Sequence, residues 1–509
     1  MSSIIIDGGP LSRADVIAVA RDGASVSAGP LLAGRMAPAR EVVQRAVDSD
    51  EVVYGITTGF GALASTHIGR DQTEALQYNL IRSHAAGVGE PLDDILVRAM
   101  LLLRARTLAQ GHSGVRPEIV ERLLEMLNSG MLPVVPSQGS VGASGDLAPF
   151  AHLALPLIGE GKVRWNGRVL TGADALAEAG LEPLRLHTKE GLSLLNGTEG
   201  MTAMGILAHD QATVLLMAAD IACALTVEAV MGSARPFRPE VHAVRPHPGQ
   251  VRSARRIAAL LAGSEISASH ADDFRHAVQD AYSLRCAPQV HGAVADTLDH
   301  MGRVLEVEMG SVVDNPIVFP DTAEVISAGN FHGQPLAFVL DFCAIAVTEL
   351  GSISERRTDR MLDPTRSAGL PAFLSPDPGV NSGYMISQYT QAALVAENRV
   401  LSHPASVESI PTSGMQEDHV SMGWGAGRKL FPVLDNTRRV LAVEMLCAAQ
   451  ALEFRKPLHP APGTAAVVAL IREHVSPLTE DRSLADEIET VAELIASGEI
   501  ATVVTGHTG

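Results

Sequence analysis

The sequence predicts a mainly α-helical protein: a long antiparallel helical bundle with a smaller α+β N-terminal part. Two observations lead to this prediction. From about residue 199 onward, long apolar stretches alternate with polar loops, and successive helices joined in this way pack antiparallel. The preceding part mixes shorter helical stretches with β-branched and glycine-rich segments. We therefore expect two domains, at residues 1–200 and 201–509.

Shorter elements are expected in the N-terminal domain. Ser12 is placed to cap a helix that runs through Val19, with Asp15 three residues on in an imperfect capping box. The Asn166-Gly167 pair predicts a hairpin, because it supplies the positive φ angles of a type I′ turn. Further helices are expected at residues 39–47, 73–83, 92–108 and 118–127.

The long helices of the second domain are the clearest elements. They are expected at residues 201–230, 294–309, 336–360, 385–401, 434–455 and 483–497. Residues 212–231 approach the length of a membrane span, but Asp220 and Glu228 interrupt the apolar run. A core helix of a large bundle is therefore the better interpretation of this segment.

Composition limits the classes of partner. The chain has 509 residues, 46% of them hydrophobic, and its formal net charge of −19 argues against nucleic acid or an anionic membrane as a main partner. The four cysteines are far apart with no C-x-x-C pair, which favours a reducing compartment. The N-terminus has no apolar run long enough for a signal sequence, so we expect a cytoplasmic protein.

The stretch 139–161 is rich in small residues and contains the triad Ala143-Ser144-Gly145. Small residues allow a sharp bend and a close approach of two peptide groups. If the Gly145 nitrogen reaches the Ala143 carbonyl carbon, a five-membered ring closes, and loss of the Ser144 hydroxyl leaves a conjugated methylene electrophile. Two other interpretations are a plain turn that opens a helix and a serine nucleophile served by His152. Ser144 lacks the Gly-x-Ser-x-Gly spacing of a nucleophile elbow.

Other loops carry polar or aromatic groups suited to binding and catalysis. They hold Tyr54, His84, Asn196, Gln279, Tyr282, Arg285, Asn330, Phe331 and Glu417. A guanidinium such as that of Arg285 can grip a carboxylate through two hydrogen bonds, although arginines in surface ion pairs are common. Glu417, Asp418 and His419 suggest a metal site, but consecutive residues of a helix point in different directions, so we expect no metal.

In their order along the chain, from Tyr54 to Met422, these motifs resemble the histidine and aromatic amino-acid ammonia-lyase family. The match includes Tyr-Gly-Ile-Thr-Thr-Gly-Phe-Gly, Ala-Ser-Gly-Asp-Leu-Ala-Pro, Tyr-Ser-Leu-Arg and Gly-Asn-Phe-His-Gly. The resemblance implies that Ala143, Ser144 and Gly145 form the 4-methylideneimidazol-5-one (MIO) group, with no dissociable cofactor. It also implies a homotetramer in which loops of more than one subunit assemble each active site.

The resemblance further implies a role for each site residue. Tyr54 would remove the β-proton of the substrate as a phenolate, although the ordinary pKa of a tyrosine is about 10. Asn196 would polarise the carbonyl of the electrophile or bind the substrate amine, and Tyr282 would assist proton transfer. Substrate-binding positions are implied for His84, Gln279, Arg285, Asn330, Phe331 and Glu417.

The pair Ser83-His84, together with Gln-Glu-Asp-His around Glu417, follows the pattern of family members that act on histidine. A carboxylate can pair with an imidazole, and His84 can complete a polar pocket. The expected reaction is therefore L-histidine to trans-urocanate and ammonia. Ala281 stands where histidine lyases often have proline, and Ser-His also occurs in tyrosine aminomutases. A tyrosine or phenylalanine lyase or 2,3-aminomutase is thus the alternative, with Glu417 as the discriminator.

Overall fold

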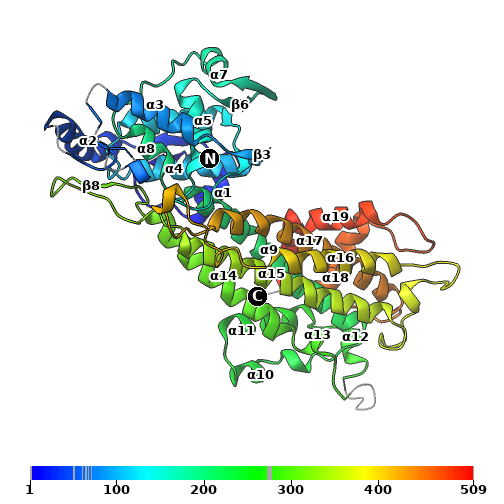
Figure 1. Ribbon diagram of the computed structural model, residues 1–509. Helices are drawn as coiled ribbons and strands as arrows, with labels where there is room; N and C mark the ends of the chain where they lie inside the picture. Colours follow the sequence, from blue (N-terminus) through cyan, green and yellow to red (C-terminus); the bar gives the residue numbers. More distant parts are fainter. Residues whose placement is uncertain are drawn as a thin grey trace. The chain divides into compact units, whose positions relative to one another are not determined.

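The computed structural model describes residues 3–49, 52–59, 61–63, 66, 68–69, 72–271 and 278–507 (Figure 1). Helices dominate these residues and the strands are short, which confirms the mainly α fold class. The chain forms two compact units. The first combines residues 1–207, 302–340 and 404–428, and the second combines 208–301, 341–403 and 429–509. The division at residue 200 stays a prediction.

The first unit is built from helices of modest length. They are α1 (Arg13–Ala20), α2 (Leu32–Ser49), α3 (Thr73–His84), α4 (Asp94–Leu108), α5 (Pro117–Ser129), α6 (Leu147–Ala154), α7 (Gly172–Glu178) and α8 (Glu190–Leu195). The capping box of α1 is confirmed: Ser12 Oγ accepts from the Asp15 N–H at 3.1 Å, and Asp15 Oδ2 accepts from the Ser12 N–H at 2.8 Å. The apolar helix α4 is buried along most of its length and forms part of the core.

The first unit also contains several small β-sheets. The strands are β1 (Ile4–Ile6), β2 (Val26–Ala28), β3 (Val88–Pro91), β4 (Leu132–Pro133), β5 (Pro136–Gln138), β6 (Lys162–Trp165), β7 (Arg168–Thr171), β8 (Ile317–Phe319) and β9 (Glu324–Ile326). β1 pairs with β2 in parallel, and the β3–β5, β4–β6, β6–β7 and β8–β9 pairs are antiparallel. The β6–β7 hairpin confirms the prediction from Asn166 and Gly167, which both have positive φ, 50° and 73°.

Four long helices contribute residues to both units: α9 (Glu199–Ala229), α14 (Ala287–Gly310), α15 (Gln334–Leu362) and α17 (Gly423–Glu453). The second unit adds α10 (Pro239–Ala243), α11 (Pro248–Leu260), α12 (Glu265–Ala268), α13 (Tyr282–Arg285), α16 (Met385–Leu401), α18 (Pro462–His474), α19 (Ala485–Ala496) and α20 (Glu499–Val503). Helix α17 begins at Gly423 rather than at the predicted Leu434 and continues through Pro432. Its buried face already starts at Trp424, so packing extends the helix beyond the proline.

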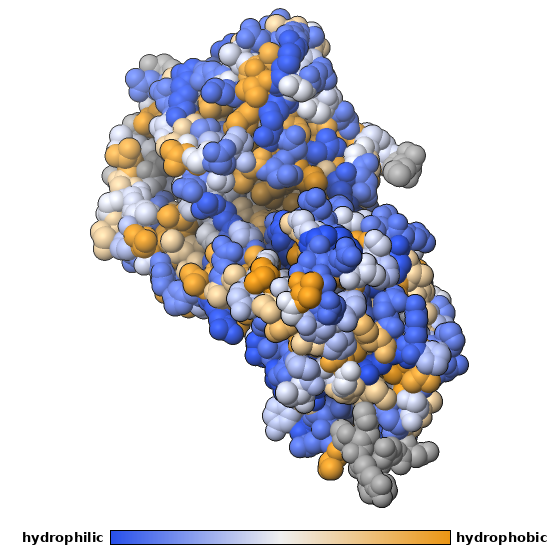
Figure 2. Space-filling model, turned by 90° about the vertical axis from the view of Figure 1, so that its right-hand side faces the viewer, coloured by the Kyte–Doolittle hydropathy of each residue, from blue (hydrophilic) through white to orange (hydrophobic). Residues whose placement is uncertain are grey.

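Two helices, α9 and α15, are long and apolar enough to cross a membrane by length and composition alone. Most of the apolar window in each, 83% and 72%, is buried inside the protein, as in the core helices of a bundle. Asp220, which interrupts the apolar run of α9, accepts hydrogen bonds from Ser253 and Arg256 at 2.6 Å. The outer face drawn in Figure 2 mixes hydrophilic residues with scattered hydrophobic ones.

Candidate active site

The triad lies in a sharp turn directly before α6. Ser144 has a φ of 49° and Gly145 a φ of 76°, both in the left-handed region that favours glycine. A Cβ atom on Gly145 would lie 1.9 Å from the carbonyl oxygen of Gly197, so no other residue fits there without a shift of the backbone. The Asp146 N–H donates to the same Gly197 oxygen at 2.8 Å. The turn is therefore locked against the loop that follows α8.

Asn196 is the C-cap residue of α8 and lies beside this turn. Its Nδ2 donates to the carbonyl oxygen of Asn315 at 2.9 Å. A carbonyl oxygen only accepts, so the amide orientation of Asn196 is fixed by this bond. Asn196 Oδ1 is buried and has no hydrogen-bond partner among the described residues. Asn196 consequently offers the acceptor Oδ1 to a ligand, and one of the two N–H donors of Nδ2 is engaged with Asn315.

Buried charged side chains form hydrogen bonds with the backbone of Asn196 and Asn315. Arg104 is 0% exposed and donates to the Asn196 carbonyl oxygen at 2.5 Å and to Glu199 Oε2 at 2.8 Å. The Lys189 ammonium pairs with Asp314 at 2.9 Å, and Asp314 accepts from the Asn315 N–H at 2.7 Å. None of these groups belongs to the motifs predicted to form the site. The apolar run Leu101-Leu102-Leu103 before Arg104 is a sequence signal for burial, whereas nothing local distinguishes Lys189 from a surface cation.

Asp146, the residue after the triad, is a buried carboxyl group. Burial raises its pKa to about 8, and this effect outweighs the hydrogen bond that Asp146 Oδ2 accepts from the Met201 N–H at 2.8 Å. At neutral pH the carboxyl is therefore mostly protonated. A neutral carboxylic acid next to the turn is able to donate a hydrogen bond, which a carboxylate cannot do.

His84, the last residue of α3, has a defined tautomer. Its Nδ1 lies 2.9 Å from the carbonyl oxygen of Leu80, which only accepts, so Nδ1 carries the proton. Burial lowers the pKa of His84, and the Leu80 hydrogen bond and the charge of Glu417 partly offset this effect. A neutral ring with its proton on Nδ1 leaves Nε2 as an acceptor. Glu417 is itself held by the Thr412 hydroxyl, which donates to Oε2 at 2.9 Å.

The loop of Tyr54 lies next to the loop of Glu417. The Gly61 N–H donates to the Tyr54 hydroxyl oxygen at 3.4 Å. A Cβ atom on Gly61 would lie 2.7 Å from Ser413 Oγ and 4.0 Å from Glu417 Oε1. Tyr54 and Glu417 thus share one region of the first unit. Phe60, within the matched motif, lies outside the described residues.

The segment after Glu417 contacts the triad loop. The Met422 N–H donates to the Val141 carbonyl oxygen at 2.9 Å, and a Cβ atom on Gly142 would lie 2.1 Å from Ser421 Oγ. His152 is engaged elsewhere, because its Nε2 accepts from the Gly87 N–H at 3.0 Å. A nitrogen whose lone pair is used in this way is a poor base for Ser144. The serine-hydrolase interpretation therefore loses its base.

Phe331 and Asn330 lie in the loop before α15. Phe331 is half-buried, and the exposed Asn330 donates through Nδ2 to the Val312 carbonyl oxygen at 3.3 Å. The neighbouring His332 stacks on His419, with ring centroids 5.9 Å apart and planes 5° from parallel. This stack places the Phe331 loop beside the segment of Glu417. No local sequence pattern predicts the stack, since the two rings are far apart along the chain.

Gln279, Tyr282 and Arg285 belong to the second unit. Tyr282 is 71% exposed and Gln279 is exposed as well. The Arg285 guanidinium lies 4.6 Å from the centre of the Tyr282 ring, and Arg285 Nε donates to the Asp280 carbonyl oxygen at 2.8 Å. The structure brings Tyr282 and Arg285 together at α13. The acidic residues 272–273, upstream of this motif, lie outside the described residues.

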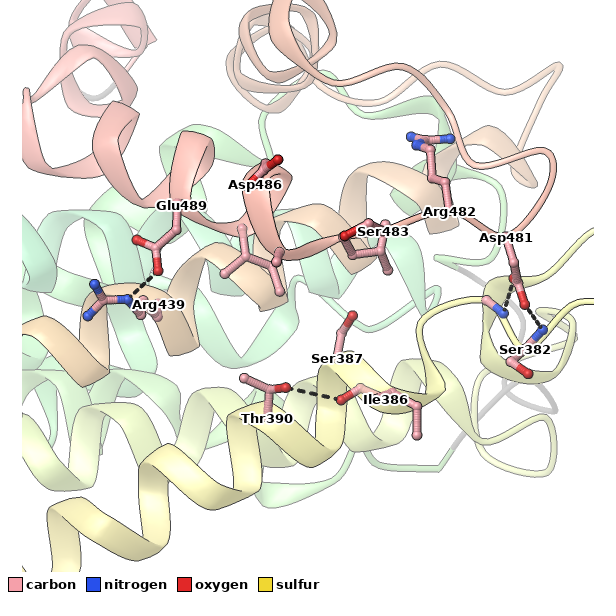
Figure 3. Close-up of a pocket in the computed structure, with 14 residues that line it drawn as sticks. Ser382, Ile386, Ser387, Thr390, Arg439, Asp481, Arg482, Ser483, Asp486 and Glu489 are labelled. Atoms are coloured by element: carbon pink, nitrogen blue, oxygen red, sulfur yellow. Dashed lines mark hydrogen bonds and ion pairs between the residues drawn. The ribbon is translucent and has the colours of Figure 1, made fainter.

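A pocket of about 530 Å³ in the second unit contains none of the predicted site residues (Figure 3). Two of its charged groups pair with each other, since Arg439 donates to Glu489 at 2.6 Å, and a third, Asp481, accepts from the backbone N–H groups of Ser382 and Gly383 at 2.7 and 2.9 Å. Within the described ranges, no group of three or more His, Cys, Asp or Glu side chains is arranged to hold a metal ion.

Comparisons with known proteins agree with the sequence resemblance. The sequence model of the aromatic amino acid lyase family matches residues 11–473. The chain is 55% identical over 502 residues to a histidine ammonia-lyase of Symbiobacterium thermophilum, covering 99% of this chain and 98% of that protein.

Solved structures show the same relationship. A tyrosine aminomutase from Streptomyces globisporus has a TM-score of 0.94 and 41% identity, covering 99% of both chains. A histidine ammonia-lyase from Trypanosoma cruzi has a TM-score of 0.91 and 42% identity, covering 99% of this chain and 96% of that one. The chain therefore belongs to the aromatic amino acid lyase family.

Proposed function

We propose that this protein is an ammonia-lyase that converts L-histidine to trans-urocanate and ammonia. The observation that carries the proposal is the pair His84 and Glu417, which lies in the same unit as Tyr54 and the triad. An acceptor nitrogen or a carboxylate can take the N–H of an imidazole ring, whereas a phenyl ring has no donor to offer either of them. The full-length similarity to histidine ammonia-lyases supports the same substrate.

The MIO group of this proposal forms from Ala143, Ser144 and Gly145. The residues present fit it, because the left-handed turn at Ser144 and the contact of Gly145 with Gly197 leave no room for a side chain at 145. Once formed, the group would supply an electrophile for the substrate amine, which would make the amine a better leaving group.

Side chains of the first unit remove the proton and bind the substrate. Tyr54, whose hydroxyl oxygen accepts a hydrogen bond from the Gly61 N–H, takes the β-proton. Asn196 accepts a hydrogen bond from the substrate amine through Oδ1, which is buried and has no partner among the described residues. His84 Nε2 and the Glu417 carboxylate orient the imidazole.

The α13 segment supplies the remaining contacts in this proposal. Arg285 binds the substrate carboxylate through its guanidinium, and the exposed Tyr282 transfers protons. Gln279, Asn330 and Phe331 line the substrate site. We also propose a cytoplasmic homotetramer with shared active sites, which the family resemblance and the high exposure of Tyr282 support.

A 2,3-aminomutase is the second candidate, because the tyrosine aminomutase structure is 41% identical to this chain. Family resemblance favours the lyase, since Glu417 is the residue that aminomutases are expected to lack. Ultraviolet absorbance with L-histidine, L-tyrosine and L-phenylalanine separates the candidates, as each conjugated acrylate absorbs differently. We expect rapid product formation with L-histidine alone. Accumulation of a β-amino acid from L-tyrosine would contradict the proposal.

A further inference from the structure

A buried chain of ionic hydrogen bonds lies inside the second unit. Asp220, His291, Arg357 and Glu444 come from α9, α14, α15 and α17, and each is 0% exposed. Arg357 binds the Glu444 carboxylate through Nε at 2.5 Å and through Nη2 at 2.8 Å. His291 Nδ1 lies 2.7 Å from Asp220 Oδ1. Charges are costly to bury, so such a group persists only with its partners in place.

The donors of this network set the direction of its hydrogen bonds. Arg357 Nη1 lies 3.4 Å from His291 Nε2. A guanidinium has donors only, so His291 Nε2 accepts this bond and the Nδ1 N–H donates to Asp220. Thr226 and Ser354 also donate to the Glu444 carboxylate. Ser253 and Arg256 donate to the Asp220 carboxylate. Arg357 is thus held in one orientation from two sides.

One hydrogen bond of Arg357 reaches outside the network. Nη1 also donates to the carbonyl oxygen of Ser283 at 3.4 Å. Ser283 lies in α13, between the exposed Tyr282 and Leu284, whose side chain is 1% exposed. The buried arginine therefore touches the backbone of the helix that carries Tyr282 and Arg285.

A helix of four residues, such as α13, is too short to be stable without tertiary contacts. Its backbone bonds amount to one turn: the Leu284 and Arg285 N–H groups donate to Ala281 at 3.1 Å, and the Cys286 N–H donates to Tyr282 at 2.8 Å. Isolated helices this short are unstable in water. Tertiary contacts must place α13, and the Ser283–Arg357 bond is one that ties it to a rigid, buried group.

We propose that Arg357 is a positioning residue for substrate binding. It holds the Ser283 carbonyl, fixes α13, and so sets the direction of the Arg285 guanidinium, while His291 keeps Arg357 oriented. The direction of Arg285 depends on this backbone, because its Nε donates to the Asp280 carbonyl oxygen. The inference rests on the proposed binding of the substrate carboxylate by Arg285.

The test compares two ligands of the full-length protein: urocanate, which has a carboxylate, and imidazole, which has none. Arg357→Lys keeps the charge opposite Glu444 but replaces the planar fork by a single ammonium. We expect the dissociation constant of urocanate to rise about tenfold, within the range of couplings between contacting groups, and that of imidazole to stay within about twofold. Arg472→Lys is the matched control, because Arg472 also joins a carboxylate, Glu453, and a carbonyl, that of Val475.

A double-mutant cycle with Arg285→Met shows whether the effect passes through Arg285. In that background we expect Arg357→Lys to change urocanate binding by less than about twofold. Equal weakening of both ligands, or the full effect in the Arg285→Met background, would overturn the inference. If Arg285→Met binds urocanate as the wild type does, the proposed role of Arg285 fails, and the inference fails with it. If Arg285→Met weakens binding but Arg357→Lys does not, only the inference fails.

Two substitutions of His291 test the same contact if Arg357→Lys does not fold. His291→Gln keeps an acceptor for Arg357 and a donor for Asp220, so we expect urocanate affinity close to that of the wild type. His291→Leu removes the acceptor and should reproduce the selective loss for urocanate. The inference is refuted if both variants bind urocanate equally well.

Discussion

Replacing Glu417 by glutamine tests the basis of substrate selection. The Thr412 hydroxyl donates to Glu417 Oε2 at 2.9 Å, and a glutamine oxygen can accept the same bond, so the side chain keeps its place. The substitution therefore removes only the negative charge that, in the proposed complex, faces the substrate ring. A hydrogen bond to a charged group contributes about 1.5–3 kcal/mol, which corresponds to a fall in kcat/KM for L-histidine of about 10- to 150-fold.

The assay for Glu417→Gln is urocanate formation followed by absorbance at several L-histidine concentrations. Asp418→Asn is the matched control, because it removes a neighbouring but exposed carboxylate. We expect the control to retain wild-type kcat/KM. Substrate selection by Glu417 is refuted if Glu417→Gln stays within about twofold of the wild type, or if Asp418→Asn loses as much activity.

Three further predictions follow from local geometry. Gly145→Ala should abolish activity, since its Cβ would lie 1.9 Å from the Gly197 oxygen, and wild-type turnover by this variant would disprove the close contact. Asp146, with its pKa raised to about 8, binds a proton that the unfolded chain lacks above about pH 4, so wild-type stability falls as pH rises towards 8. Urea unfolding at pH 5.5 and 9 should show Asp146→Asn gaining stability relative to the wild type at the higher pH; a constant difference would count against this. Ser12→Ala should cost about 1 kcal/mol in urea unfolding by removing the α1 cap, and an unchanged midpoint would rule the cap unimportant.

Local chemistry made much of the fold predictable. Asn166 and Gly167 adopt the positive φ angles of the predicted hairpin, and the Ser12–Asp15 capping box opens α1. These features depend on neighbouring residues, so the sequence contains the full signal. The start of α17 was missed, because burial of Trp424 against other helices extends the helix through Pro432.

The candidate site was predictable in its residues but not in its hydrogen bonding. The motifs identified Asn196 and His84, yet the acceptor character of each follows from a partner, the carbonyl of Asn315 or of Leu80. The buried Arg104 behind Asn196 was not predicted either. Such partners depend on tertiary packing between distant segments, which single-sequence patterns do not encode.

The central claim is that Ala143, Ser144 and Gly145 become a reactive ring, and the intact mass of the purified chain tests it most directly. Ring closure and loss of the Ser144 hydroxyl each release one water. We expect the wild type to weigh two water molecules less than its sequence requires, and Ser144→Ala to lack the ring and its activity. A wild-type mass equal to that of the unmodified sequence, in a preparation that still forms urocanate, would contradict the account.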